Sequence, residues 1–166
     1  YKRQVRSIVG VLQYIANSTR PDISYATGVV ARQVAEPTDG TVKRCKRILA
    51  YLKGTAELGP EYSPAKERSF RTTFQKVVNA GMKDRELPNT VNFTDSDFAG
   101  CPVTMRSTSG SIMYHRGCPI IWSSKRQSIL SHSTCEAEYC GIYDMIRISQ
   151  AQGYLDWFMS EEDLIT

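Results

Sequence analysis

The chain has 166 residues, 41% of them hydrophobic and 23% charged, which suits one domain or a small domain with an appendage. No run of eighteen apolar residues is present, and this excludes a membrane-spanning helix. The formal net charge is +4, and residues 1–55 carry ten Lys or Arg against three acidic residues. Such a basic first third is typical of a polyanion-binding segment, although solvated helix faces would give the same composition.

The five cysteines are odd in number and form no C-x-x-C pair, which indicates reduced thiols and an intracellular setting. Two pairs, His115 with Cys118 and His132 with Cys135, have no matching second pair that would complete a zinc site. The chain does not begin with Met and shows no charged-then-apolar leader, so we expect a piece of a longer polypeptide, or a processed or trimmed product.

Residues 1–55 predict three short helices that pack as a small bundle or an αα-layer. Apolar residues recur at helical spacing from Val5 to Ala16. Pro21 suits the first turn of a second helix, which continues through Val34 and is ended by Pro37. Thr38 or Asp39 can cap a third helix, and Gly54 can end it.

The third predicted helix carries most of the positive charge. Its apolar face is Val42, Cys45, Ile48, Leu49 and Leu52, and basic residues surround the opposite side. We therefore predict that nucleic acid binds this side, through Lys43, Arg44, Lys46, Arg47 and Lys53.

Residues 56–90 have the weakest pattern and predict a partly ordered connector. Tyr62 can close a short strand in it. Four apolar residues predict one or two helical turns before Gly81: Phe70, Phe74, Val77 and Val78.

From Val91 the pattern becomes strand-like. Three strands are predicted, over residues 91–97, 109–115 and 119–124, and the tight turn at Arg116-Gly117-Cys118 makes them an antiparallel meander. A long helix follows, from about Ser133 to about Met159, with Gly153 as a candidate break.

Two acids end the first predicted strand. Asp95 and Asp97 point to one side by period-two alternation, and paired carboxylates are ligands that hard divalent cations prefer. An exposed strand end entering a turn would also favour Asp, so the motif alone does not decide between a cation site and such a strand end.

Two glutamates begin the long helix. Ser133 as N-cap places Glu136 in a capping box. Glu138 aligns instead with Ile142, Met145, Ile146 and Ser149, on the face predicted to pack against the sheet. A carboxylate there needs a positive partner, because burying it alone costs several kcal/mol. A metal ion shared with Asp95 would supply that partner.

The order of these motifs resembles a copia-type LTR retrotransposon polyprotein, at the end of the reverse transcriptase and the N-terminal part of its ribonuclease H domain. The resemblance covers nearly the whole chain and rests on SIVGVLQYIANSTRPDISYATGVVAR, KRCKRILAYLKGT, FTDSDFAG, RSTSGSIMYHRGCPIIWSSKRQ and STCEAEY. It implies an α+β fold with a helical, thumb- or connection-like segment at 1–55 and a connector at 56–90. A truncated ribonuclease H-like domain would follow at 91–166, with a three-stranded meander and a long helix.

The resemblance also implies site residues. Asp95 and Glu138 would be catalytic acids that bind Mg²⁺, with Asp97 as a possible further ligand. In the complete domain, two such ions support hydrolysis of RNA in RNA–DNA hybrids. No residue of this chain matches the family's third acid, so we expect catalysis by this chain to be incomplete.

Two functions therefore stay open. The first is a fragment of a reverse transcriptase and ribonuclease H. The second is a co-opted, non-catalytic subunit that serves as a nucleic-acid-binding or structural scaffold in a larger assembly. Expected partners are an RNA–DNA hybrid or structured RNA, and a protein that completes the open edge of the sheet.

Overall fold

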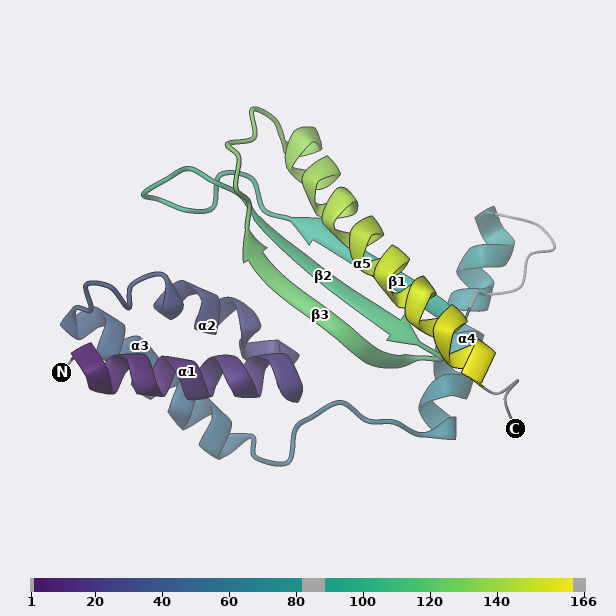
Figure 1. Ribbon diagram of the computed structural model, residues 1–166, viewed down its shortest axis with the longest axis horizontal. Coiled ribbons are helices and arrows are strands. Elements are labelled where there is room, and N and C mark those ends of the chain that lie inside the picture. The colour runs from purple at the N-terminus through teal and green to yellow at the C-terminus, as the bar shows by residue number, and fades with distance from the viewer. Residues whose placement is uncertain (1, 82–88, 163–166) are drawn as a thin grey trace.

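The computed structural model describes residues 2–81 and 89–162, and their side chains except at 77–79, 81 and 154–162. The predicted α+β class is confirmed (Figure 1). None of the described helices is both long and apolar enough to cross a membrane. In chain order the elements are α1 Lys2–Ser18, the 3-10 turn η1 Pro21–Ile23, α2 Ser24–Ala31, α3 Asp39–Gly54, α4 Pro64–Gly81, β1 Thr90–Ser96, β2 Thr108–His115, β3 Cys118–Arg126 and α5 Thr134–Glu162.

Helices α1, α2 and α3 form the predicted bundle around one apolar core. Leu12 is fully buried at its centre, and the core consists of Val5, Val9, Leu12, Ala16, Ile23, Val30, Cys45 and Ile48. Thr38 caps α3, because its hydroxyl accepts from the backbone N–H of Thr41 and the Thr41 hydroxyl accepts from the backbone N–H of Thr38.

The second helix ends earlier than predicted, at Ala31 instead of near Val34. Tight turns follow it, with Gln33 N–H donating to Val30 O and Val34 N–H to Ala31 O. The side-chain oxygen of Gln33 accepts from Thr41 and Arg44 of α3. These bonds stabilise the turns, and the helix does not continue through them.

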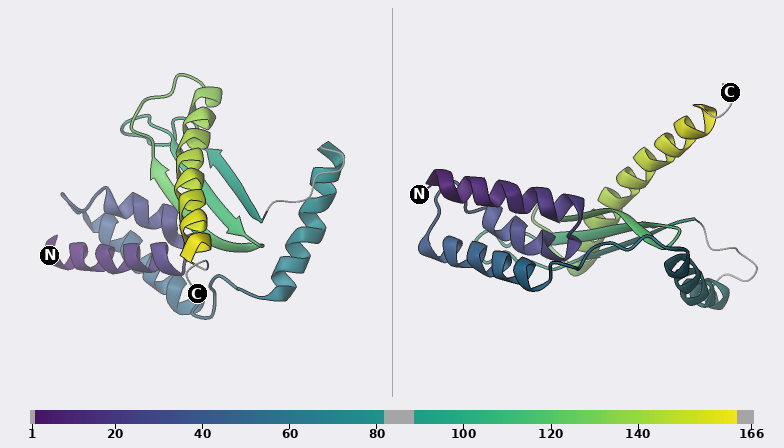
Figure 2. Two further views of the ribbon diagram at one scale, coloured as in Figure 1. Left: turned by 45° about the vertical axis from the view of Figure 1, so that its right-hand side comes forward. Right: turned by 90° about the horizontal axis from the view of Figure 1, so that it is seen from below.

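The three strands form an antiparallel sheet in the order β1-β2-β3, which confirms the predicted meander. Asp95 pairs with Gly110, and Gly110 pairs with Ser124. Helix α5 covers one face above β1 and β2, whereas α4 lies on the other face (Figure 2). Among the described residues no strand pairs with the outer side of β1.

The helical turns predicted before Gly81 are confirmed, but they belong to a longer helix than expected, since α4 has 18 residues. Phe70 and Phe74 lie one helical turn apart and pack on the sheet, with ring centroids 5.6 Å from Tyr114 and 5.3 Å from Phe93 respectively. This aromatic cluster stabilises a helix that the polar composition did not favour. Tyr62 closes no strand, and its hydroxyl donates to Pro119 O at 2.8 Å. The end of the predicted connector, residues 82–88, lies outside the described residues.

The bundle joins the sheet at β3. The indole N–H of Trp122 donates to Ala16 O at 2.6 Å. A Cβ built on Gly28 of α2 would lie only 3.8 Å from Ser124 O, so α2 packs closely along β3. The N-terminal helices thus protect one edge of the sheet and leave β1 as the open edge.

Helix α5 runs without interruption through Gly153, so the candidate break there is absent. Its buried face also differs from the prediction: Ala137, Gly141 and Met145 are buried, whereas Ile142 is 42% and Ile146 50% exposed. A Cβ on Gly141 would lie 2.7 Å from Ser96 Oγ. The helix therefore approaches the sheet most closely at Gly141.

Candidate metal site and basic surface

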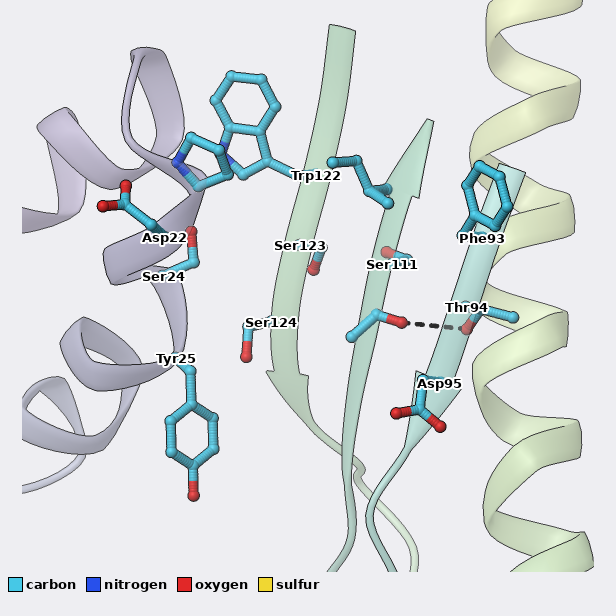
Figure 3. Close-up of a pocket in the computed structure, with 13 residues that line it drawn as sticks. Asp22, Ser24, Tyr25, Phe93, Thr94, Asp95, Ser111, Trp122, Ser123 and Ser124 are labelled. Carbon is cyan, nitrogen blue, oxygen red and sulfur yellow. Dashed lines mark hydrogen bonds between the residues drawn. The ribbon is translucent and has the colours of Figure 1, made fainter. Parts of the chain in front are cut away.

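Asp95 is the second-to-last residue of β1, and its side chain is exposed. By strand alternation it shares a face with Phe93, on the side of the sheet turned away from α5. There it lines a cavity of about 350 Å³ between α2 and the sheet (Figure 3), together with residues that include Tyr25, Trp122 and Ser124.

Glu138 reaches the same end of β1 from α5. Its Oε1 accepts from the backbone N–H of Ser96 at 3.4 Å. The N–H of Asp97 donates to Thr108 O on β2. Because successive N–H groups of a strand point to opposite sides, the N–H of Ser96 points to the open edge. Glu138 therefore lies at that edge, beside Asp95.

The two predicted acids thus gather at one strand end, but from different directions. The structure gives no hydrogen bond between them among the described residues. No described basic side chain forms an ion pair with Glu138. Carboxylates open to solvent suit Mg²⁺, which keeps several of its waters and accepts a few protein oxygens. Within the described part of the chain, no three His, Cys, Asp or Glu side chains gather as a metal cluster.

Asp97 has a structural role in the loop after β1. Its Oδ1 accepts from the backbone N–H of Thr108. A Cβ on Gly100 would meet the Asp97 carboxylate, so a larger residue at this position would have to displace that side chain. Asp97 therefore joins the loop to the start of β2.

The loop also holds Cys101. Hydrogen bonds from the side chain and backbone of Thr104, the backbone of Val103 and the guanidinium of Arg126 lower the pKa of the Cys101 thiol to about 6. Arg126 Nη1 lies 3.6 Å from its sulfur. No local sequence pattern indicates this contact, because the two residues come from distant parts of the chain.

The start of α5 has the predicted cap. Ser133 Oγ accepts from the backbone N–H of Glu136, which confirms Ser133 as N-cap. The Glu136 carboxylate accepts from the backbone N–H of His132 at 2.7 Å. Glu136 thus belongs to the helix cap, whereas Glu138 contacts the backbone of β1.

A buried amide network lies between α5 and the sheet, and the sequence patterns did not indicate it. Gln127, just after β3, is 6% exposed and bonds to β2, to α5 and to the loop before α5. A polar residue after a strand gives no local sign that it will be buried by a helix ten residues later.

The predicted basic surface is exposed as expected. Lys43, Lys46 and Arg47 lie on the outer side of α3, opposite the buried Cys45 and Ile48. Arg44 and Lys53 are also exposed. Arg44 Nη1 donates to Gln33 Oε1 at 2.9 Å, so it also serves the contact between α3 and the turn after α2.

Known proteins resemble this chain in sequence. An uncharacterised mitochondrial protein of Arabidopsis thaliana is 42% identical over 63% of this chain and 35% of its own length. The retrovirus-related Pol polyprotein from transposon RE2 of the same plant is 35% identical over 67% of this chain and 6% of its own length. A transposon Ty5-1 protein of Saccharomyces cerevisiae is 31% identical over 61% of this chain and 32% of its own length.

The chain spans about a third of the first of these relatives and a small part of the Pol polyprotein. No family model matches it, and no solved structure does.

Proposed function

We propose that residues 91–166 are the N-terminal part of a copia-type ribonuclease H-like domain, because the chain is similar in sequence to retrovirus-related Pol polyproteins from transposons. The complete domain would cut RNA in RNA–DNA hybrids. The observation that supports this most directly is the placement of Glu138 at the open edge of β1, with its Oε1 on Ser96 N–H and next to Asp95. Residues 1–55 would be the thumb- or connection-like end of the reverse transcriptase, and 56–90 the segment between the two.

Mg²⁺ would be held by Asp95 and Glu138 and would supply activation of water and stabilisation of the leaving oxygen. The chain's own residues orient the two carboxylates: Ser96 N–H holds Glu138, and the pairing with Gly110 holds Asp95. Two acids alone would bind Mg²⁺ weakly, since too few carboxylates offset its dehydration. A strand added at the open edge of β1, from a protein partner, would complete the sheet and bring further ligands.

We expect Mg²⁺ to bind the chain, and Asp95→Asn or Glu138→Gln to weaken this binding about tenfold, because each removes one of few charged ligands. The binding is measured by calorimetry or by Mg²⁺ titration of the amide NMR signals near Ser96. Asp144→Asn is the matched control, since Asp144 is an acid of the same helix that lines a different cavity. Equal affinities for all four proteins would rule out a site at Asp95 and Glu138.

A second function is favoured by the basic side of α3. In this alternative the chain is a co-opted, non-catalytic subunit that binds nucleic acid or serves as a scaffold. Lys43, Lys46 and Arg47 are exposed on one helix, where they can contact successive phosphates.

Replacing Lys43, Lys46 and Arg47 together by Gln is expected to weaken binding of an RNA–DNA hybrid at least tenfold at low salt. The negative slope of log K against log salt should become less steep by up to about 3, because each lost phosphate contact removes about one unit from its magnitude. Fluorescence anisotropy over a salt series measures both. The control variant replaces two Lys and one Arg on α4, at Lys66, Arg68 and Lys76, and so changes the net charge equally. A control variant that weakens binding as much would show that net charge alone matters.

A further inference from the structure

Gln127 uses every hydrogen-bonding group of its buried side chain. Its Nε2 donates to Ser109 Oγ on β2 and to Ala137 O on α5, both at 2.8 Å. Its Oε1 accepts from Ser131 Oγ, also at 2.8 Å. One amide therefore joins the sheet, the loop before α5 and the first turn of α5.

The groups that this amide holds are neighbours of the two acids. Ala137 precedes Glu138 in the chain, so the bond to Ala137 O fixes the helix turn that carries Glu138. Ser109 Oγ lies 3.1 Å from Ser96 Oγ, and Ser96 follows Asp95. Ser96 Oγ is also 3.5 Å from Gln127 Nε2. The Gln127 side chain thus connects the end of β1 to the start of α5.

We propose that Gln127 is a positioning residue, which sets the start of α5 against the end of β1 and so holds Glu138 beside Asp95. The magnesium part of this inference rests on the proposed function. Only an amide has the required groups here. A side chain of equal length without polar atoms would lose the bonds to Ala137 O, Ser109 Oγ and Ser131 Oγ, and a carboxylate would face Ala137 O with a negative charge.

Measuring the Mg²⁺ affinity distinguishes a Gln127 that positions Glu138 from one that only stabilises the fold. We expect Gln127→Met to weaken Mg²⁺ binding about tenfold, which is the effect expected for the loss of one ligand. The control is Val9→Ala, which removes buried methyl groups from the N-terminal core and lowers stability without touching the network. Val9→Ala should leave the Mg²⁺ affinity unchanged. Equal effects of the two variants would overturn the proposal.

A measurement without metal tests positioning separately from the proposed function. The amide NMR signal of Ser96 reports its hydrogen bond to Glu138. We expect Gln127→Met to shift this signal, and to shift it by less than half as much when Glu138 is already Ala. Equal shifts in both backgrounds would show that Gln127 does not act on Glu138, and would overturn the proposal even if Mg²⁺ binds.

If wild-type chain binds no Mg²⁺, the proposed metal site fails, and the Ser96 comparison still decides whether Gln127 positions Glu138. If Gln127→Met does not fold, Ser131→Ala takes its place, since it removes only the hydroxyl that holds Gln127 Oε1. Ser131→Ala should shift the Ser96 amide signal, and should shift it by less than half as much when Glu138 is already Ala. No shift in that variant would count against the proposal.

Discussion

Replacing Arg20 by alanine is expected to lower the free energy of unfolding by about 3 kcal/mol, because it removes a buried guanidinium whose charge-assisted hydrogen bonds join Asp22 and Thr55. Arg20 is 5% exposed. Its guanidinium donates to Asp22 through Nε and Nη2, and to Thr55 O and Thr55 Oγ1 at 2.8 and 2.7 Å. It also lies 5.4 Å from the ring centroid of Tyr51. The variant would lose all of these contacts between η1 and the end of α3.

Arg20→Lys is the informative comparison. An ammonium keeps the charge next to Asp22, but it cannot donate to Asp22 and to both oxygens of Thr55 with the planar geometry of a guanidinium. The loss should therefore be intermediate. Urea unfolding followed by circular dichroism measures both variants. An Arg20→Ala protein as stable as the wild type would contradict the role of this residue.

The contribution of the pair should depend on pH in one direction. The hydrogen bond from Arg20 lowers the pKa of Asp22 below its usual value of 3.8. A carboxyl with a lowered folded-state pKa stabilises the fold fully above its unfolded pKa. This contribution is lost as the pH falls from 3.8 through the lowered pKa. The stability difference between wild type and Arg20→Ala should thus be constant near neutral pH and should shrink in acid.

Two glycines of α5 should respond oppositely to alanine. Gly141→Ala is expected to destabilise the protein by about 1–3 kcal/mol, because its methyl group would overpack the interface with the sheet. A Cβ there would lie 2.7 Å from Ser96 Oγ and 2.9 Å from Thr94 Oγ1. Both hydroxyls are held, by Ser109 Oγ and by Gly110 O, so neither can turn away without losing a bond.

Gly153→Ala is the matched control in the same helix. Nothing lies within 4 Å of a Cβ at this position, and the residue is exposed. It should therefore stabilise the helix by up to about 1 kcal/mol, through the lower backbone entropy of alanine. Thermal unfolding of both variants measures the contrast. A Gly141→Ala protein that gains stability like Gly153→Ala would show that α5 does not pack on β1 through this residue.

Much of the fold could be predicted because it depends on residues close in sequence. Thr38 caps α3 through Thr41, and Ser133 caps α5 through Glu136. The meander follows from alternating strands joined by a turn at Gly117, which has φ +78°. Adjacent residues also sufficed to predict the exposed cations of α3.

The full length of α4 was not predicted, for a different reason. Residues 64–81 have a polar composition, and their helix depends on Phe70 and Phe74 meeting Tyr114 and Phe93. Those partners follow much later in the chain. Local propensity is a weak guide where distant packing decides the outcome.

By itself, the sequence determined the order of most elements, apart from the extent of α4, and the similarity to retrotransposon Pol polyproteins, because caps, periodicity and motif strings are local. Only the tertiary structure decided which face of α5 is buried and which groups hold Glu138 near Asp95. These depend on Gly141 meeting Ser96 and on Gln127 meeting Ala137, contacts made across the interface between helix and sheet. Burial of small and polar residues there follows from close approach and paired hydrogen bonds, which no single stretch of sequence contains.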